Sequence, residues 1–261
     1  MTTRARDIAG WLRQQLVAAG ARGFAIGLSG GVDSAVVARL CQMAAPDRVV
    51  AVMMPCHSAP ADEADARAVA EHFNMPAVLI DLAPAYDRMA EDVQAALLQV
   101  PAEPAPAGGG PEDAAPMPLA NLKARLRMAT LYAVAGSRGY LVAGTGNRSE
   151  LMIGYFTKYG DGGVDVLPLG MLMKGEVVSL ARALNVPEAI IVKPPSAGLW
   201  PGQTDEQEMG FRYADLERYV NEGPDAIAPA LAMRIERLVR ASEHKRTRPP
   251  MPDLEERGPE G

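Results

Sequence analysis

The sequence predicts an α/β fold in which helices flank a doubly wound parallel sheet. Two observations favour this class. Short apolar runs alternate with helical segments along the first part of the 261 residues, and the run at 24–28 ends directly in a glycine turn that opens a helix. Each link between runs is long enough for the helical crossover that parallel strands require. The length suits one sizeable core, so we expect a single domain over residues 1–248.

The individual elements follow from local patterns. A first helix should pack on the sheet and stop at Gly20, because apolar residues recur in it at helical spacing: Ile8, Trp11, Leu12, Leu16 and Val17. Apolar or β-branched runs predict strands over 24–28, 48–54 and 77–80. Between and after them we expect helices over 35–43, from a cap at Asp62 to about 72, and over 86–98.

The composition changes after this alternation. Residues 101–111 are rich in Pro, Ala and Gly and have no apolar period, so we expect a mobile loop at about 100–117. A helix should follow over 119–132. Its predicted core face is Leu122, Leu126, Ala129 and Ala133, and its predicted solvated basic face is Lys123, Arg125 and Arg127. A fourth strand is predicted over 140–144, and the acidic, Pro-rich tail over 249–261 should be disordered.

The glycine turn Leu28-Ser29-Gly30-Gly31-Val32-Asp33-Ser34 predicts a phosphate site. Its small residues leave backbone N–H groups accessible, and the following helix directs its positive end toward the turn. A carboxylate next to polyphosphate is favourable when it holds Mg²⁺. The alternative interpretation is an ordinary helix start with Ser or Asp caps. The hexapeptide lacks the Lys of the GxxxxGK[ST] loop and resembles the pyrophosphate loop of the ATP pyrophosphatases.

Parallel strands present their carboxyl ends at one edge, so the residues after each strand should lie close together. Thr145 and Glu150 are therefore expected to share the site of the Ser29 turn. Cys56 and His57 follow the second strand and could line the same pocket. A buried apolar role for Cys56 and a plain loop position for His57 are the alternatives.

Composition limits the class of partner and the compartment. Lys and Arg total 26 and Asp and Glu total 32, so the net charge of −6 argues against non-specific nucleic-acid binding. The two cysteines form no CxxC pair, which favours a reducing, cytoplasmic location. Because no apolar run approaches 18 residues and no signal core is visible, we expect no membrane span and no export.

Residues 154–165 mix aromatics, Lys, Asp and Gly without periodicity, a composition typical of a substrate-binding loop. With this segment the sequence resembles the NAD synthetase family over about residues 8–246. The matching segments are 29–34, 121–125 with 127–128, 144–150, 154–165, Lys174, 193–200, 202–206 and 244–246.

This resemblance implies a Rossmann-like fold of the adenine-nucleotide α-hydrolase type and a C–N ligase that completes NAD biosynthesis. ATP would adenylate the nicotinate carboxylate of deamido-NAD, and ammonia would then displace AMP. ATP would be the co-substrate and Mg²⁺ the cofactor. Direct use of ammonia is expected, because the glutamine-using members carry an N-terminal amidase domain, whereas a single helix is predicted before the turn here. A separate amidase subunit that supplies ammonia is the alternative that stays open.

The resemblance also implies roles for individual residues. ATP would contact Ser29, Gly30, Gly31, Val32, Asp33, Ser34, Arg125, Thr145, Lys174 and Ser196. Deamido-NAD would contact Tyr155, Phe156, Lys158, Asp161, Asp165, His244 and Lys245, at the interface of a homodimer. Asp33 and Glu150 would hold Mg²⁺, and Asp161 and Lys174 would be catalytic. An exposed lysine at a helix start is the alternative for Lys174, and core packing is the alternative for Phe156.

Two other functions stay open on the sequence. One is a different ATP pyrophosphatase, such as a GMP-synthetase-like amidase partner or a tRNA thiolase. A thiolase would need catalytic cysteines and a basic RNA face, and neither is visible. The other is a nucleotide-binding regulatory module that has lost its chemistry.

Overall fold

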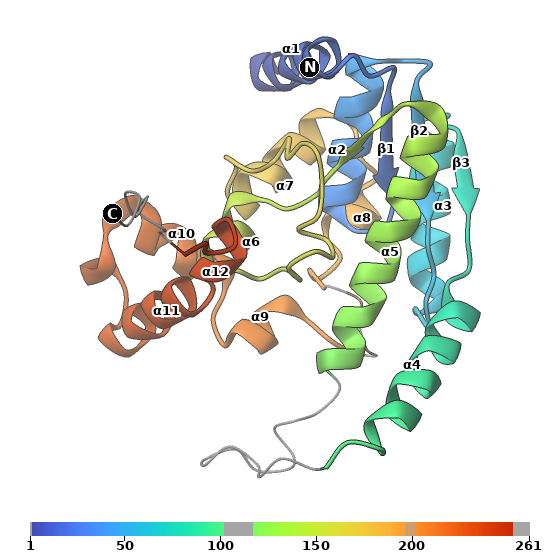
Figure 1. Ribbon diagram of the computed structural model, residues 1–261. Coiled ribbons are helices and arrows are strands. Elements are labelled where there is room, and N and C mark those ends of the chain that lie inside the picture. Colours follow the sequence, from blue (N-terminus) through green and yellow to red (C-terminus); the bar gives the residue numbers. More distant parts are fainter. Residues whose placement is uncertain (1, 102–116, 197, 199, 201, 253–261) are drawn as a thin grey trace, which may run out of the picture.

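A parallel sheet forms the centre of the computed structural model, which describes residues 2–101, 117–196, 198, 200 and 202–252 (Figure 1). Within these residues the strand order is β3 (Ala77–Leu79), β2 (Val49–Met53), β1 (Phe24–Gly27) and β4 (Leu141–Ala143). Neighbouring strands are parallel, and Phe24 of β1 pairs with Val49 on one side and Leu141 on the other. The chain runs outward from β1 to β3 and then returns to the far side of β1 as β4. The predicted doubly wound α/β fold is therefore confirmed, with its switch point between β1 and β4.

Helices cover both faces of the sheet. One core joins β1 to α1 (Thr3–Ala19), α2 (Val32–Ala44), α3 (Pro60–His72), α7 (Lys174–Ala183) and α8 (Glu188–Ile191). The opposite core contains α5 (Met117–Arg138), against which α4 (Ala83–Leu97) packs. Successive strand residues alternate between the cores, because Phe24 and Ile26 enter the first and Ala25 the second.

The first helix differs from its prediction. It ends at Gly20 in the left-handed conformation, as expected, but it packs on α2 rather than on the sheet. Its buried residues are Ala5, Ala9, Leu12 and Leu16. Trp11 is 38% exposed and Val17 83% exposed, so these two large side chains do not belong to the buried face. Alanines allow the close approach to α2 that a tryptophan would prevent.

Other helices also begin earlier than predicted, among them α2, α3 and α4. The α2 helix starts at Val32, inside the glycine turn, and α4 starts at Ala83. Pro60 occupies the first turn of α3, so Asp62 lies inside this helix and is not its cap. Pro-containing first turns extend α3 and α4 beyond the apolar pattern used to place them.

The predicted faces of α5 are also wrong. Ala129 and Ala133 are exposed, and the buried residues of the helix include Ala124, Leu131 and Ala135. Lys123 is only 9% exposed, so the basic residues do not form a solvated face. Its Nζ lies 5.3 Å from the centre of the Tyr86 ring. Long basic side chains can bury their aliphatic stems beneath neighbouring elements, which helical spacing alone does not reveal.

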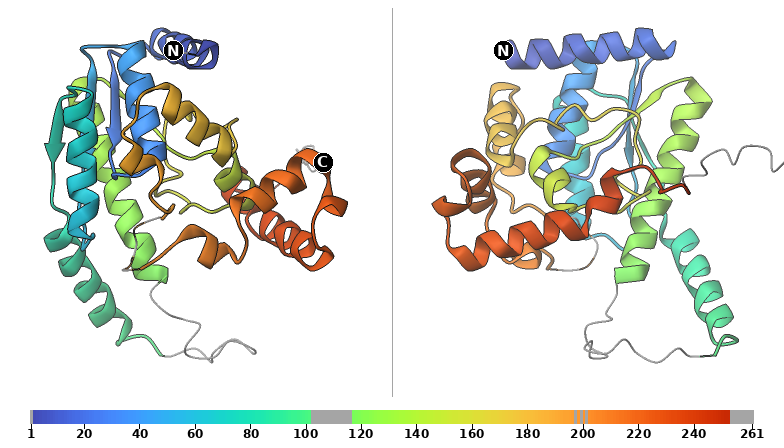
Figure 2. Two further views of the ribbon diagram at one scale, coloured as in Figure 1. Left: turned by 180° about the vertical axis from the view of Figure 1, so that it is seen from behind. Right: turned by 60° about the vertical axis from the view of Figure 1, so that its left-hand side comes forward.

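A second layer of helices lies beside the sheet, as both views in Figure 2 show. It contains α6 (Arg148–Ile153), α9 (Asp205–Met209), α10 (Tyr213–Glu222), the 3₁₀ turn Pro224–Ala226, α11 (Pro229–Ala241) and α12 (Glu243–Arg246). Ile153, Met209, Phe211, Leu216 and Ile235 form its core. No helix of this layer was expected from the sequence patterns.

The predicted loop at about 100–117 and the predicted tail at 249–261 lie largely outside the described residues, which lack 102–116 and 253–261. None of the helices in the described part of the chain has both the length and the apolarity needed to cross a membrane.

Candidate functional site

A cavity of about 600 Å³ lies at the switch point of the sheet. Its walls include residues that follow β1, β2 and β4, residues of the segment 154–164, and described residues between Lys193 and Glu208. Polar side chains from distant parts of the chain therefore meet at the carboxyl edge, as the parallel topology predicts.

The glycine turn forms one end of this cavity. The Ser34 hydroxyl donates to the Gly31 carbonyl (2.9 Å), and the Ser29 hydroxyl accepts the Gly31 N–H (3.3 Å). Gly31 is the N-cap of α2, yet no side chain accepts the N–H groups that open the helix. The alternative interpretation of a side-chain-capped helix start is therefore not supported. Open N–H groups together with the helix dipole favour an anion at this position.

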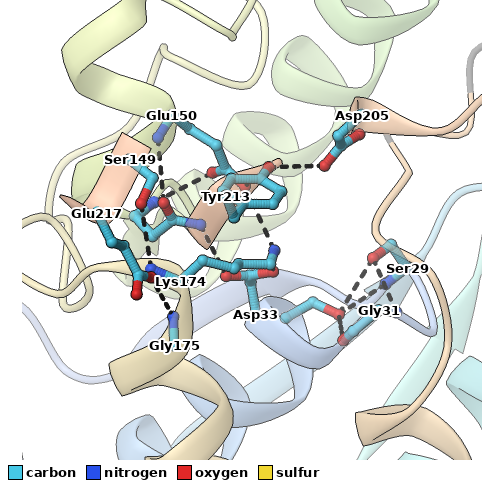
Figure 3. A network of polar contacts seen from close by, with 12 residues as sticks. Ser29, Gly31, Asp33, Ser149, Glu150, Lys174, Gly175, Asp205, Tyr213 and Glu217 are labelled. Carbon is cyan, nitrogen blue, oxygen red and sulfur yellow. Dashed lines mark hydrogen bonds and ion pairs between the residues drawn. The ribbon is translucent and has the colours of Figure 1, made fainter. Parts of the chain in front are cut away.

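A buried lysine joins two carboxylates beside this turn (Figure 3). Lys174 is 5% exposed, and its Nζ forms a short ion pair with Asp33 Oδ2 and a longer one with Glu150 Oε1 (3.5 Å). Lys174 does begin helix α7, but its burial rules out the alternative of an exposed helix-start lysine. Its backbone N–H donates to the Ser149 hydroxyl (3.1 Å), which fixes α7 against α6.

Asn147 sets the position of both carboxylates. The side-chain amide N–H of Asn147 donates to Asp33 Oδ1 (3.0 Å), and its side-chain oxygen Oδ1 accepts the Glu150 N–H (3.1 Å). The Glu150 carboxylate in turn accepts the Asn147 N–H (3.1 Å), which completes a capping box at the start of α6. The Asn-x-x-Glu spacing is the sequence signal that identifies this capping box.

Two carboxylates, Asp33 and Glu150, share one ammonium group, that of Lys174. Burial and the negative charge of Asp33 raise the pKa of Glu150 to about 8, while Lys174 and the Asn147 N–H act in the opposite direction. Burial lowers the pKa of Lys174, but the charges of Asp33 and Glu150 more than compensate and raise it overall. Lys174 therefore balances one ionised carboxylate, and a further cation beside the two carboxylates would favour the ionised form of Glu150.

Asp205 and Tyr213 join this group from α9 and α10. The Tyr213 hydroxyl donates to Asp205 Oδ2 (2.8 Å) and lies 3.5 Å from Glu150 Oε1. The Lys174 Nζ lies 5.2 Å from the centre of the Tyr213 ring. Sequence reasoning gave neither residue a role. A buried acid in a polar segment carries no local signal of its partner.

Other predicted residues also line the cavity, among them Thr145, Tyr155, Phe156, Asp161, Ser196 and Lys245. The Lys245 ammonium donates to the carbonyls of Gly154 (2.7 Å) and Phe156 (2.8 Å). Asp161 is exposed as a whole residue, but its carboxylate accepts the Thr157 N–H (2.8 Å). Loss of water raises the pKa of Asp161, and the bonds it accepts partly offset this.

Comparison with known proteins decides the family. Residues 4–249 match the sequence model of the NAD synthase family. An NH(3)-dependent NAD(+) synthetase from Carboxydothermus hydrogenoformans is 46% identical over 251 residues, which are 96% of this chain and 97% of that protein. An NH(3)-dependent NAD(+) synthetase from Archaeoglobus fulgidus is 44% identical, and the match covers 94% of each chain. The chain belongs to the NAD synthase family.

Solved structures agree with this assignment. An NMN synthetase from Francisella tularensis is 34% identical, with a TM-score of 0.85 and coverage of 96% of this chain and 98% of that one. An NH3-dependent NAD synthetase from Campylobacter jejuni is 27% identical, with a TM-score of 0.74 and coverage of 97% and 100%. Membership of the NAD synthase family confirms the predicted enzyme class, a ligase of NAD biosynthesis that uses ATP.

Several predicted residues lie outside the cavity of this NAD synthase fold. Gly30, Arg125, Lys158, Asp165 and His244 are not among its lining residues, nor are Cys56 and His57. The Asp165 carboxylate accepts the Val142 N–H (2.7 Å) and the Tyr132 hydroxyl (2.9 Å), which fastens the 154–165 segment to β4 and α5. Lys158 Nζ donates to the His244 carbonyl (2.6 Å).

Cys56 is fully buried, which agrees with the alternative of a buried apolar role. His57 occupies an exposed loop and pairs with Asp87 (2.6 Å).

Proposed function

We propose that this chain joins ammonia to the nicotinate carboxylate of deamido-NAD with the help of ATP, producing NAD, AMP and pyrophosphate. The observation that carries the proposal is the Asp33–Lys174–Glu150 group beside the open N-terminus of α2. The carboxylate oxygen would attack the α-phosphorus of ATP, so that pyrophosphate leaves and an acyl-adenylate forms. Ammonia would then attack the carbonyl carbon, AMP would leave, and the added nitrogen would lose one proton.

The residues of the first step have complementary roles. The α2 N–H groups and the Ser29 and Ser34 hydroxyls would bind the departing pyrophosphate. Lys174 would neutralise charge that develops at the α-phosphate, because it is held in a nearly water-free position. Thr145 and Ser196 line the same cavity and would orient the nucleotide.

The donor set fits Mg²⁺. Asp33 and Glu150 offer two hard oxygen ligands, and the described residues contain no group of three metal-binding side chains close enough to form a complete protein site. Mg²⁺ usually binds one or two carboxylates and completes its shell with phosphate oxygens and water. Burial and the charge of Asp33 raise the pKa of Glu150, and a bound cation would counteract both effects by favouring the ionised carboxylate. When bound, Mg²⁺ would withdraw charge from the phosphates.

Asp161 would take the proton in the second step. Its carboxylate lines the cavity, and the Thr157 N–H fixes its orientation. The variant Asp161→Asn should lower kcat by about 100-fold or more and leave the Kd for ATP unchanged. Because burial raises the pKa of Asp161, the carboxylate is present above that value and is lost as pH falls through it. Wild-type turnover should therefore have an acid limb that Asp161→Asn lacks. An unchanged kcat would exclude this role.

Deamido-NAD would lie along Tyr155, Phe156 and Lys245, which line the cavity. Phe156 also lies close to Gly162, where an added Cβ would meet its ring at 2.5 Å. Its side chain is half-buried and is in none of the core clusters of the described residues, so the core-packing alternative is not supported. We retain Arg125, Lys158, Asp165 and His244 as proposed contacts of bound substrate, since they neighbour the same loop.

A homodimer is supported by an apolar surface on β3 and α4. Edge strand β3 exposes its residues, and α4 has Ala90 as its buried residue. Exposed apolar side chains follow the same two elements: Val78, Leu79, Met89, Val93, Leu97 and Leu98. Such a patch is typical of a subunit interface. In Figures 1 and 2, α4 extends away from the body of the fold.

Light scattering should therefore give a wild-type mass twice that of the 27.7 kDa chain. The double variant V93E/L97E should be monomeric, because two charges replace apolar contacts. A control variant, Val17→Glu, changes an exposed apolar residue of α1 and should leave the mass unchanged. A monomeric wild-type protein would remove this proposal.

A cytoplasmic location is also proposed, because both cysteines are unpaired buried thiols, a state that a reducing compartment maintains. Cell fractionation that recovers the protein outside the cytoplasm would contradict it.

A second candidate acceptor is nicotinate mononucleotide. The NMN synthetase of Francisella tularensis has a TM-score of 0.85 with this chain, compared with 0.74 for the Campylobacter jejuni NAD synthetase. Both acceptors present the same nicotinate carboxylate, so the same residues would adenylate either one.

The test of function is amide formation from each acceptor with ATP, Mg²⁺ and either ammonium chloride or glutamine. We expect product with ammonium alone and a higher kcat/KM for deamido-NAD. A higher value for the mononucleotide would select the second candidate. No AMP release with either acceptor would refute both.

A further inference from the structure

A second cavity, of about 390 Å³, lies at the opposite edge of the sheet from the candidate active site and is lined by Arg22, Arg48, Arg138 and Tyr140. Arg22 precedes β1, Arg48 precedes β2, and the other two residues precede β4, so all four lie at the amino ends of parallel strands. In Figure 1 the arrowheads of β1 and β3 point away from this edge. Among the described residues, this arginine cavity shares no lining residue with the candidate active site.

Backbone contacts bring the loops of the arginine cavity together. The Arg22 N–H donates to the Gly139 carbonyl (2.8 Å), and the Phe24 N–H donates to the Arg48 carbonyl (2.9 Å). Gly23 permits the close approach of these segments, because an added Cβ there would overlap the Arg48 carbonyl oxygen. The three loops that supply the arginines are therefore fixed relative to one another by the protein itself.

The end of α5 explains the orientation of Arg22. The Nε and Nη2 groups of Arg22 both donate to the carbonyl of Arg138, the last residue of this helix, with Nε at 2.8 Å. Gly139 follows in the left-handed conformation, and an added Cβ there would lie 3.2 Å from Arg22 Nε. Carbonyl groups at a helix C-terminus favour a cation, so Arg22 has a structural role in closing α5.

The other two arginines have no such role. The side chains of Arg48 and Arg138 are exposed, and neither forms an ion pair or a side-chain hydrogen bond with any described residue. The hydroxyl of the half-buried Tyr140 is likewise without a partner in the described part of the chain. Acidic residues outnumber basic ones in the sequence, yet no carboxylate lines the arginine cavity. Guanidinium groups that converge without a counter-charge repel one another, and an anion between them removes this repulsion.

We propose that the arginine cavity binds a phosphate-bearing anion, either free pyrophosphate or the phosphates of a nucleotide. Guanidinium groups present paired N–H donors that match phosphate oxygens, and three of them balance the multiple negative charge of such a ligand. The Tyr140 hydroxyl supplies a further donor. The volume of about 390 Å³ lies within the range of small-molecule sites. Occupancy of this cavity does not require the proposed reaction, because its residues are at the edge of the sheet that faces away from the glycine turn.

Equilibrium dialysis of the full chain against labelled pyrophosphate tests this site. The double variant R48Q/R138Q should bind one pyrophosphate fewer per chain than the wild type, or bind it at this site with a Kd at least about tenfold higher, because two charge-assisted contacts are removed. Arg22 is left in place because it closes α5. The urea unfolding midpoint of the variant should equal that of the wild type, since neither replaced side chain is bonded within the described residues.

The matched control is the double variant R237Q/R240Q. Arg237 and Arg240 are exposed residues of α11, and neither lines the arginine cavity or the candidate active site. This variant removes the same charge from another surface and should bind as much pyrophosphate as the wild type. Pyrophosphate held at the glycine turn is retained in both double variants, so the difference between them reports the arginine cavity alone.

Competition identifies the form of the ligand. Unlabelled ATP and unlabelled pyrophosphate are titrated against the portion of bound label that R48Q/R138Q lacks. Displacement at a lower concentration of ATP would identify a nucleotide, and displacement at a lower concentration of pyrophosphate would identify the free anion. Both results support a site for phosphate groups.

Two results would overturn the proposal. Equal pyrophosphate binding by the wild type and R48Q/R138Q would mean that the arginine cavity holds no phosphate. An equal loss in R48Q/R138Q and R237Q/R240Q would mean that the net charge of the chain, and not this cavity, attracts the anion.

Discussion

Replacing Lys174 with methionine is expected to abolish turnover and to lower the free energy of unfolding by about 3–5 kcal/mol. The Lys174 ammonium is the ion-pair partner of both Asp33 and Glu150, and it is 5% exposed. Methionine retains most of the side-chain volume but leaves two carboxylates close together without a counter-charge. Urea unfolding measures the first effect, and AMP release measures the second.

Mg²⁺ should partly restore the stability of this variant, because it supplies positive charge to the same carboxylates. It should raise the unfolding midpoint of Lys174→Met more than that of the wild type. Arg4→Met is the control, since Arg4 pairs with Glu176 on the same helix (2.7 Å) but is about half exposed. An exposed pair contributes at most about 1 kcal/mol, so this variant should keep both its stability and its activity. Wild-type turnover in Lys174→Met would contradict the proposed role.

Substituting Gly30 with alanine should reduce kcat/KM for ATP by about 100-fold or more. Gly30 has φ of +79°, and an added Cβ would lie 2.6 Å from the Asp62 carbonyl oxygen and 2.8 Å from Asp65 Cβ. A left-handed conformation costs a non-glycine residue about 1–2 kcal/mol, and the clash adds to this. The glycine turn would have to move away from the start of α3, which displaces the pyrophosphate site.

Gly20→Ala separates the clash from the strain. Gly20 also has positive φ (+61°), but an added Cβ there meets nothing within 4 Å. This control should lose about 1–2 kcal/mol of stability and keep its kcat/KM for ATP. If Gly30→Ala behaved like Gly20→Ala, close packing of the turn on α3 would not be a requirement for ATP binding.

Local patterns were sufficient to predict the sheet and the location of the site. Four short apolar runs became the four parallel strands of the described chain, and the Ser29–Ser34 turn lies at the end of β1. Parallel connections place all strand ends at one edge, so Thr145 and Glu150 could be assigned to the same site as Ser29. The resemblance added Lys174 and Asp161, for which no local pattern was informative.

Local patterns failed where packing partners decide exposure. Trp11 and Val17 fit the helical period of α1, yet alanines make its contact with α2. Lys123 reads as a solvated residue, yet α4 covers it through Tyr86. Periodicity gives the direction of a side chain around its helix but not which neighbour lies there.

The sequence by itself determined the fold class, the position of the glycine turn and the family. The tertiary structure alone decided how Lys174 joins Asp33, a residue 141 positions away, and how Tyr213 connects Asp205 to Glu150. Strands, turns and caps arise from interactions between near neighbours, which a sequence displays directly. Charge compensation in a buried site depends on side chains that meet only after the helical layer of α9 to α11 has packed beside the sheet.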